Sequence, residues 1–385
     1  MGNLFTWAIY QAQKYLENQK IFDSDPEWAH HDAIRMAQIF DDSVFAKGIL
    51  ETMIGYEHPS LKQELRWQEY KNPIGLAAWF TKEADGMQFL EQFGFGYMVI
   101  GWVTGNAQEG NPKQRLFRYT NLGSIVNRMW LPGIGVDAMA LKLAKMKLNK
   151  QRPTVPIWIN VANSLKTNID DKPIEISMII QKLYPYADVR ELNASCPNQK
   201  WVTDIQKGWW LKEMIQSSQL ANEKMALAHR VAKKPIVVKI WPLTSYPEDH
   251  EKQQDLTIED LEHIVDVCIT CKVDGIVTTN TAKEHIGIPK EQDKIWGMSG
   301  ALLREKSLMT AKTVKDMIGT NSDIKLIWVG GIGTGKTQKE IWKSSVDMMH
   351  VGADLQQMLT GFVMWGTVVA PRIIKEALVK YKKNT

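Results

Sequence analysis

Short hydrophobic runs alternate with helical stretches from about residue 67 to the end of the chain. Eight of these runs are rich in strand-forming residues, and they span residues 73–78, 97–103, 156–162, 188–194, 235–241, 275–280, 325–330 and 354–359. Buried strands that alternate with helices predict a parallel sheet, which is either closed into a (β/α)8 barrel or open and doubly wound. Asparagine, lysine, threonine and glycine residues follow the ends of many different runs, as functional residues do in a barrel. We therefore expect an α/β fold of the (β/α)8, or TIM barrel, type.

The first 66 residues have a different pattern. Between residues 4 and 16, apolar side chains recur at helical spacing. A second amphipathic segment begins at Asp25 and Pro26, which resemble a helix cap followed by a first-turn proline, and it continues to Ile49. Such stripes either pack on the protein's own core or lie against a lipid surface or a hydrophobic ligand. We expect an N-terminal helical extension at residues 1–66 and a barrel at residues 67–385.

Composition and charge narrow the class of protein. The chain has 385 residues, of which 44% are hydrophobic and 23% charged, an ordinary globular composition. Its 47 basic and 43 acidic residues leave a net charge of +4, which is too balanced to indicate a nucleic-acid partner. We find no secretory signal and no apolar run of about 18 residues, so we expect a protein that is soluble or lies on a membrane surface. Cys268 and Cys271 have metal-type spacing but lack a second pair, so no metal is expected.

A glycine-rich stretch follows the seventh run. Residues 330–337 fit the G-x-x-x-x-G-K-[ST] pattern of a nucleotide P-loop. Glycines in such a loop let a phosphate approach backbone N–H groups, so the stretch predicts a phosphate more firmly than it predicts ATP hydrolysis. A P-loop normally opens its sheet, whereas only about 50 residues follow this one, without a strand that ends in an acidic Mg²⁺ ligand. A P-loop NTPase therefore remains only as an alternative.

Residues 191–198, at the end of the fourth run, place a thiol between two asparagines. Cys196 follows a strand and precedes a proline-fixed turn, which favours a presented side chain over a buried structural one. The stretch resembles the N-x-S-[SC]-P-N signature of dihydroorotate dehydrogenases, the flavin enzymes of pyrimidine synthesis. Other stretches resemble that family in order, and they span residues 72–78, 110–118, 127–129, 238–239, 279–281, 297–300, 329–332 and 360–361. The resemblance extends from about residue 25 to residue 372.

The resemblance implies FMN at the C-terminal mouth of a barrel, with its phosphate held by the loops after the last two strands. On this basis Gly330 and Gly331 cradle the phosphate, and Lys336 and Thr337 complete the P-loop pattern by accident. Lys239 matches the lysine beside the flavin pyrimidine ring, where positive charge stabilises the anionic reduced cofactor. The residues that match cofactor contacts are Ala77, Ala78, Asn160, Asn193, Lys239, Thr279, Gly300, Gly330, Gly331, Leu359 and Thr360.

The implied reaction is the oxidation of dihydroorotate to orotate on the route to UMP. It removes a proton from C5 and a hydride from C6, so the site needs a base on one face of the ring and the flavin on the other. Cys196 occupies the family's base position, and a thiol with a pKa near 8.5 predicts activity that climbs on the alkaline side. Lys82 matches the cation that binds the substrate carboxylate. The residues that match substrate contacts are Lys82, Asn127, Arg128, Met129, Asn193, Asn198, Asn280 and Thr281.

The electron acceptor divides the family into subclasses. The N-terminal helical pair and residues 110–118 resemble the membrane-associated, quinone-using class 2 enzymes, whose base is usually serine. Cys196, Leu131 and Pro132 look more like the cytosolic classes, which use fumarate or an NAD-linked partner subunit. We favour quinone as the electron acceptor, because the N-terminal extension suits a quinone tunnel and a segment that binds the membrane surface. This implies a peripheral protein on the cytoplasmic side of the cell membrane, or a cytoplasmic one; an inactive flavin-binding homologue and the oligomeric state stay open.

Tryptophan is unusually frequent, at 15 of 385 residues. Six tryptophans stand where the family pattern has glycine: Trp67, Trp79, Trp130, Trp158, Trp296 and Trp328. Overpacking by a few methylenes already costs about 1–3 kcal/mol, so six indoles should hinder folding or cofactor binding. We hypothesise that the source organism reads UGA as glycine and that the written sequence renders this codon as tryptophan. The alternative is a genuine, remodelled site.

Overall fold

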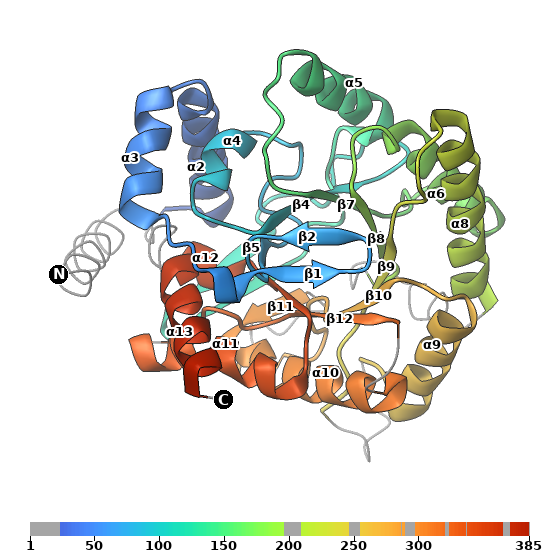
Figure 1. Ribbon diagram of the computed structural model, residues 1–385. Coiled ribbons are helices and arrows are strands. Elements are labelled where there is room, and N and C mark those ends of the chain that lie inside the picture. Colours follow the sequence, from blue (N-terminus) through green and yellow to red (C-terminus); the bar gives the residue numbers. More distant parts are fainter. Residues whose placement is uncertain are drawn as a thin grey trace.

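A closed barrel of eight parallel strands forms the centre of the molecule (Figure 1). The computed structural model describes residues 24–195, 209–245, 255–285, 287–288, 297–319, 323–335, 337–364 and 370–384. Around the barrel the strands follow the order β10-β12-β13-β3-β4-β7-β8-β9, and every neighbouring pair is parallel. These strands are β3 (Ile74–Leu76), β4 (Tyr97–Val103), β7 (Ile157–Val161), β8 (Val189–Asn193), β9 (Ile236–Ile240), β10 (Gly275–Thr278), β12 (Lys325–Val329) and β13 (Leu355–Met358). Each lies within one of the eight hydrophobic runs, so the expected (β/α)8 barrel is confirmed.

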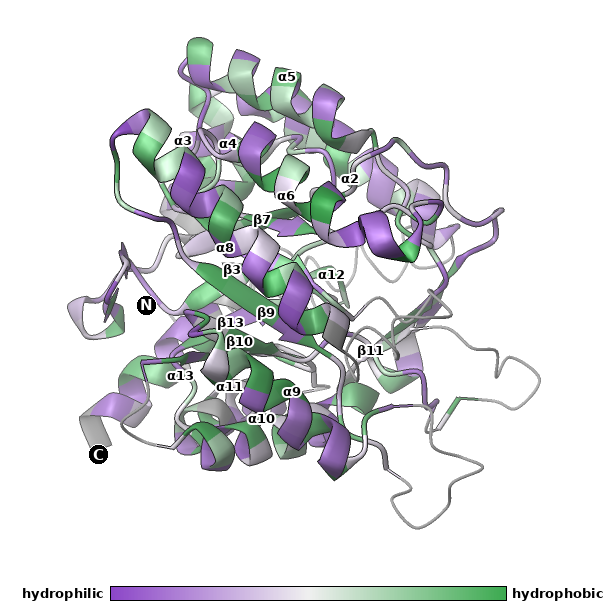
Figure 2. Ribbon diagram, turned by 90° about the vertical axis from the view of Figure 1, so that its right-hand side faces the viewer, coloured by the Kyte–Doolittle hydropathy of each residue, from purple (hydrophilic) through white to green (hydrophobic). Residues whose placement is uncertain are grey.

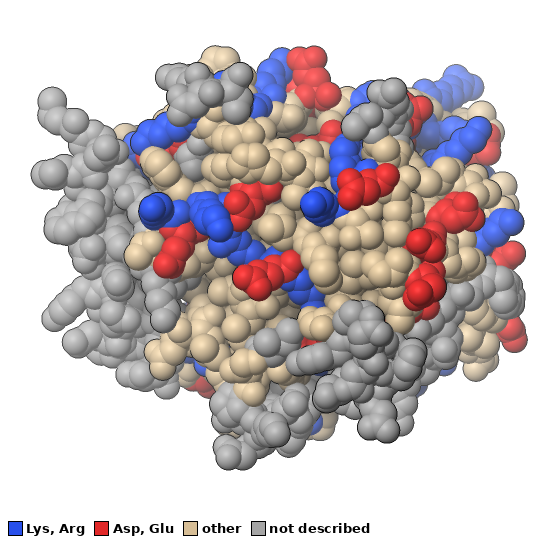
Figure 3. All heavy atoms as spheres, turned by 90° about the horizontal axis from the view of Figure 1, so that it is seen from below, with Lys and Arg blue, Asp and Glu red and all other residues tan. Residues whose placement is uncertain are grey.

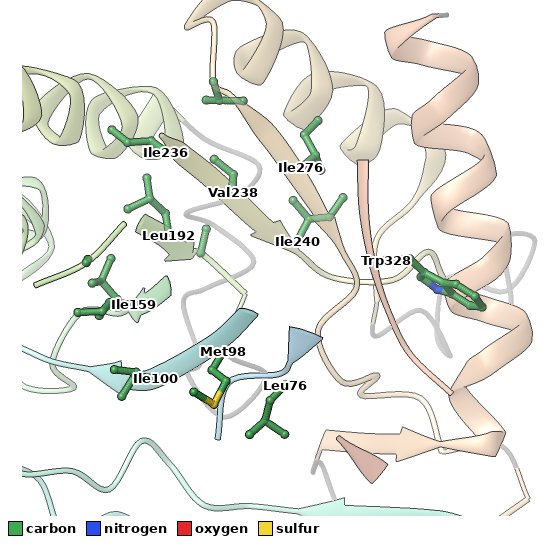
Figure 4. Packing of buried hydrophobic residues seen from close by; sticks show 14 of the residues in the cluster. Leu76, Met98, Ile100, Ile159, Leu192, Ile236, Val238, Ile240, Ile276 and Trp328 are labelled. Atoms are coloured by element: carbon green, nitrogen blue, oxygen red, sulfur yellow. The ribbon is translucent and has the colours of Figure 1, made fainter. Parts of the chain in front are cut away.

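Alternate residues of the barrel strands face opposite sides, as the period of a strand requires. Outward-facing residues such as Met98, Val238 and Ile276 pack under the surrounding helices (Figure 4). Inward-facing residues form a separate apolar layer near the amino ends of the strands. That inner layer includes Tyr97, Val99, Trp158, Val189, Val237, Val277, Ile327 and Leu355. The barrel interior is therefore a packed core at this end and can hold a ligand only at the other.

Helices surround the barrel, and the hydropathy colouring shows mainly hydrophobic central strands inside helices with hydrophilic stretches (Figure 2). Capping sets the amino end of α2, because the Asp25 carboxylate accepts from the backbone N–H groups of Glu27 and Trp28. The helices are α2 (Pro26–Asp41), α3 (Val44–Ile54), α4 (Met87–Glu91), α5 (Gly135–Leu148), α6 (Lys172–Leu183), α8 (Trp209–His229), α9 (Ile258–Thr270), α10 (Arg304–Ile318), α11 (Gln338–Val351), α12 (Thr360–Met364) and α13 (Ala370–Asn384). Short 3-10 turns lie at Pro59–Leu61, Thr120–Leu122, Ile169–Asp171 and Ala301–Leu303.

Two small sheets stand outside the barrel. The hairpin of β1 (Gln63–Leu65) and β2 (Gln68–Tyr70) lies in front of it in Figure 1, and buried Tyr70 packs edge-on against Tyr97 and Trp158 of the inner layer. The other sheet joins β5 (Leu116–Tyr119), β6 (Ser124–Asn127) and β11 (Gly297–Gly300) in antiparallel order. The expected boundary between residues 66 and 67 lies in the turn of the hairpin, which itself closes the amino end of the barrel.

The N-terminal region differs from the expectation in one respect. The single helical segment expected to run from Asp25 to Ile49 is two helices, because Ser43 adopts an extended conformation and its hydroxyl caps α3 through the Ala46 N–H. The first expected segment, at residues 4–16, lies outside the described residues. The α2 helix is docked on the barrel through buried Ala37, whereas Val44 and Phe45 at the start of α3 are exposed.

Surface properties agree with the modest net charge. Figure 3 shows one face of the molecule, on which basic and acidic side chains are interspersed. None of the helices in the described ranges combines the length and the hydropathy that a membrane crossing requires.

Candidate active site

A cavity opens at the carboxyl ends of the barrel strands. Every residue that matches a cofactor contact of the family lies in its wall, as do Asn127, Asn280 and Thr281 of the substrate set. The barrel thus gathers these side chains from strands and loops that are far apart in the sequence. The remaining wall residues are Trp79, Trp102, Leu116, Ile125, Ser299, Leu303, Val329, Ile332 and Gln357.

A chain of side-chain amides forms part of the wall. The Asn280 Nδ2 donates to Asn193 Oδ1 at 3.2 Å, and the Asn193 Nδ2 donates to Asn160 Oδ1 at 3.2 Å. The Asn160 Nδ2 in turn donates to Glu191 Oε1 at 2.6 Å. The backbone of Ser195 also holds two of these amides in place. Its N–H donates to Asn193 Oδ1 at 3.3 Å, and its carbonyl accepts from the Asn280 amide. The three asparagines are therefore oriented before any ligand arrives.

Glu191 is a carboxylate in the barrel interior to which the sequence analysis assigned no role. It is 0% exposed, and it accepts from Gln357 Nε2 at 2.7 Å as well as from Asn160. The Lys239 Nζ lies 3.6 Å from Glu191 Oε1. A signal for Glu191 was available, since it stands two residues before Asn193 on one strand and so shares its face.

Glycines form the opposite wall. Gly300, Gly330 and Gly331 have φ values of 94°, 143° and 72°, a region that favours glycine. A Cβ on Gly331 would lie 2.5 Å from the Cβ of Arg304, and one on Gly300 would lie 2.4 Å from the Gly123 carbonyl oxygen. Side chains are excluded here by both conformation and space, which leaves bare backbone facing the cavity.

The end of the P-loop pattern has a structural role. Thr337 is exposed, and its hydroxyl accepts from the Glu340 N–H while its own N–H donates to the Glu340 carboxylate at 3.2 Å. This reciprocal pair is a capping box for α11. Thr337 is thus engaged at a helix end, and Lys336 lies outside the described residues.

A second cavity lies between α2 and the barrel, and Lys82 lines it rather than the first cavity. Arg115 Nη2 forms an ion pair with Glu27 at 2.7 Å on the same wall. Burial would raise the pKa of Glu27, but the Arg115 hydrogen bond and charge outweigh it and the pKa is lowered. Burial, followed by the charge of Lys82, lowers the pKa of His30 to about 3, so this imidazole is neutral at ordinary pH. Burial likewise lowers the pKa of Lys82 to about 8.

Trp79 stands between the two cavities. Its indole lines the first cavity and stacks on the His30 ring of the second, with 4.9 Å between ring centroids and 23° between ring planes. The Lys82 Nζ lies 5.7 Å from the centre of the same indole. The indole N–H of Trp79 is buried and has no hydrogen-bond partner among the described residues. This side chain therefore separates Lys82 from the other residues of the expected substrate site.

Backbone conformation distinguishes two of the tryptophans that replace glycine in the family pattern. Trp79 and Trp130 have φ values of 91° and 62°, a region that bulky side chains rarely adopt. The others differ: Trp158 is buried in the inner layer of the barrel, and Trp328 points from β12 to hydrogen-bond Ser307 of α10 (Figure 4). Trp67 is half-buried, and its indole N–H donates to the Tyr70 hydroxyl at 3.2 Å. Trp296 lies outside the described residues.

Several expected site residues are absent from the first cavity. Cys196 and Asn198 lie outside the described residues, although Ser195, directly before Cys196, is buried and bonded to Asn193 and Asn280 of the cavity wall. Arg128 directs its guanidinium to the Gln114 carbonyl at 3.2 Å, and Met129 is fully buried in an apolar cluster with Trp79. Among the described residues, no group of three or more histidine, cysteine, aspartate or glutamate side chains is placed to hold a metal ion.

Comparison with known proteins places the whole chain in one family. The family model described as dihydroorotate dehydrogenase matches residues 60–380. A relative from Gloeobacter violaceus, named dihydroorotate dehydrogenase (quinone), is 30% identical over 94% of this chain and 93% of its own length. One of the same name from Pseudomonas aeruginosa is 30% identical over 94% and 96%. The ligand-free DHODH structure from Eimeria tenella superposes with a TM-score of 0.77 at 25% identity, covering 94% of this chain and 96% of that one. The resemblance carried by the ordered motifs is confirmed, and this chain belongs to the dihydroorotate dehydrogenase family.

Proposed function

We propose that this chain oxidises dihydroorotate to orotate and passes the electrons to a quinone. The observation that carries the proposal is the cavity at the carboxyl end of the barrel, into which the amides, Lys239 and the glycine wall converge. The relatives named for quinone cover almost the full length of the chain, including the N-terminal helices. In pyrimidine synthesis such an enzyme produces the orotate from which UMP is made.

The donor set of the cavity fits FMN. Bare backbone at Gly330 and Gly331 suits a phosphate, which needs N–H groups at close range. Lys239 and the amides of Asn160 and Asn193 suit the polar edge of a flavin ring, which offers both donors and acceptors. When bound, the flavin supplies the hydride acceptor.

The remaining chemistry belongs to the side chains. Asn127, Asn280 and Thr281 supply donors and acceptors for the amide edges of a dihydropyrimidine ring. Cys196 directly follows Ser195, which is held by Asn193 and Asn280 of the cavity wall, and we assign Cys196 the role of base for the C5 proton. Lys82 is assigned the substrate carboxylate in a protein that has glycine at position 79, where no indole separates it from the first cavity.

Rapid mixing of the flavin-loaded protein with dihydroorotate tests the proposal. We expect the flavin absorbance to bleach on mixing and to return when a ubiquinone analogue is added. Return with fumarate or NAD but not with quinone would instead assign the protein to a cytosolic class. A colourless protein that binds Mg-ATP would contradict the proposal altogether.

Orotate affinity of the Trp79→Gly protein, in which Lys82 reaches the first cavity, should fall as pH rises above about 8. The pKa of Lys82 is lowered from 10.5 to about 8, so its positive charge is present below this pH and is lost above it. The affinity for a carboxylate that needs this charge falls by up to about tenfold per pH unit beyond the pKa. Orotate titrations from pH 6.5 to 9.5 measure this, and adding Lys82→Met should give weak binding with a flat profile. An affinity of the Trp79→Gly protein that is constant across this range would remove Lys82 from the carboxylate site.

The N-terminal helices present an apolar surface that suits a membrane. Val44 and Phe45 of α3 are 82% and 78% exposed, and Trp28 and Ile39 of α2 are also exposed. Exposed apolar side chains on a short helical pair can insert into a lipid interface. The cavity beneath α2 has a mixed wall, in which Ile34, Phe80 and the neutral His30 stand beside charged residues such as Lys82 and Arg115. We assign the quinone to this cavity and peripheral membrane binding to α3.

Changing Val44, Phe45 and Ile49 together to glutamine should abolish liposome association and weaken turnover with a membrane-borne quinone. Reduction by dihydroorotate should be unaffected, because these residues do not reach the barrel. Deletion of residues 1–60 is a poorer test, since it also removes Glu27 from Arg115 and uncovers the surface beneath Ala37. A matched control changes the exposed Leu141 and Leu148 of α5 to glutamine. Equal loss of liposome binding in both variants would contradict the assignment of α3.

A further inference from the structure

Glu191 lies directly beneath the floor of the cavity. Its three partners, Asn160, Lys239 and Gln357, belong to β7, β9 and β13 and all line the cavity, while Glu191 itself has no exposed surface. The layer below it is apolar, with Val189 two residues earlier on the same strand. Glu191 is therefore placed where its charge acts on the cavity floor and on little else.

Hydrogen bonding alone does not require a carboxylate at this position. Asn160 and Gln357 each donate one N–H to Glu191, and a glutamine could satisfy both, because the amide of Gln357 can turn to present its oxygen. A buried charge is expensive, and a buried ion pair by itself adds little to stability. The feature that a neutral amide could not provide is compensation of the Lys239 ammonium.

The distance and the burial make that compensation strong. The Lys239 Nζ lies 3.6 Å from Glu191 Oε1, and the two side chains are 8% and 0% exposed. Charges at this range interact strongly when little water separates them. The pair therefore presents N–H donors to the cavity while most of the positive field of Lys239 is cancelled.

We propose that Glu191 is the counter-ion of Lys239 and lowers the reduction potential of the bound flavin. This inference rests on the proposed function, because it concerns a flavin placed beside Lys239. An uncompensated ammonium favours the anionic reduced flavin and holds electrons there. With Glu191 beneath it, Lys239 still binds the ring edge, but the reduced cofactor is less favoured and electrons pass more readily to the acceptor. Glu191 acts through Lys239 and is a positioning and tuning residue.

Glu191→Gln removes the charge and keeps the shape and the hydrogen bonds. The midpoint potential of the bound flavin, measured by dye equilibration at pH 7, should become more positive by about 30 mV, which for a two-electron couple is a tenfold shift toward the reduced form. Flavin reduction by dihydroorotate should be retained, while reoxidation by quinone slows. The matched control is Arg190→Lys, one residue earlier on β8, where the side chain lies over Tyr184 away from the cavity. An unchanged or more negative potential in Glu191→Gln would overturn the proposal.

A second measurement needs no flavin. Denaturant unfolding of the flavin-free wild type, Glu191→Gln, Lys239→Met and the double variant gives the coupling between the two charges. We expect each single variant to lose at least tenfold in the folding equilibrium constant and the double variant to recover part of that loss. Additive losses would show that the two residues are not counter-ions and would overturn the proposal. A wild-type protein that binds no FMN but shows the coupling would contradict the proposed function alone.

Discussion

Replacing Cys196 by serine is expected to slow flavin reduction by dihydroorotate about 100-fold or more at neutral pH. A thiol with a pKa near 8.5 is partly ionised at neutral pH, whereas a serine hydroxyl is a far weaker acid and needs additional activation to remove a proton. In the sequence Cys196 directly follows Ser195, which is hydrogen-bonded to Asn193 and Asn280 of the cavity wall. Single-turnover absorbance traces between pH 6 and 9 measure the effect.

Orotate binding is the internal control for this variant. The base acts in the transition state and makes few contacts with the bound product, so the dissociation constant of orotate should be nearly unchanged. The wild-type rate should climb with pH toward the thiol pKa. A variant that reduces its flavin at the wild-type rate at every pH would exclude Cys196 from proton removal.

Trp79→Gly is expected to raise the affinity for FMN at least tenfold. The indole occupies the wall where the family pattern has glycine, and Trp79 has a φ of 91°, which costs a bulky residue about 1–3 kcal/mol. Overpacking of a binding site by a side chain costs a similar amount, and each 1.4 kcal/mol is tenfold in affinity. Removal of the indole also joins the two cavities, so Lys82 gains access to the substrate site. FMN titration of flavin-free protein, with the exposed Trp28→Gly as the control, measures the change.

The same backbone conformation bears on which residue the natural protein contains. If the organism reads UGA as glycine, peptides of the native protein will carry glycine at positions 79 and 130, where positive φ values favour it. Peptide mass spectrometry distinguishes the two residues directly. Tryptophan in those native peptides would exclude the reassigned codon, and Trp79 would then be a genuine partition between the cavities.

The sequence by itself was sufficient for the fold, and it named most of the residues that line the first cavity. In runs such as residues 97–103 and 235–241, alternate side chains pack against the helices and against the barrel axis. This alternation is a property of each strand by itself. Asn160, Asn193 and Thr279, which the family resemblance marked, lie together because parallel strands bring their carboxyl ends to one edge. Helix boundaries were predicted less reliably. Hydrophobic spacing alone predicts one helix across Ser43, but the Ser43 hydroxyl caps a second helix there.

The tertiary structure decided the contacts between strands that are distant in the sequence. Glu191, Lys239 and Gln357 meet only because the barrel closes, so no local pattern reveals that the carboxylate compensates the lysine. In the same way Lys82, expected with the substrate amides, lies on the far side of Trp79, because the direction of a side chain depends on which neighbour fills the intervening space. The periodicity of a helix or strand is set within a few residues. The electric field and the free volume at a site depend instead on every chain segment that folding brings there.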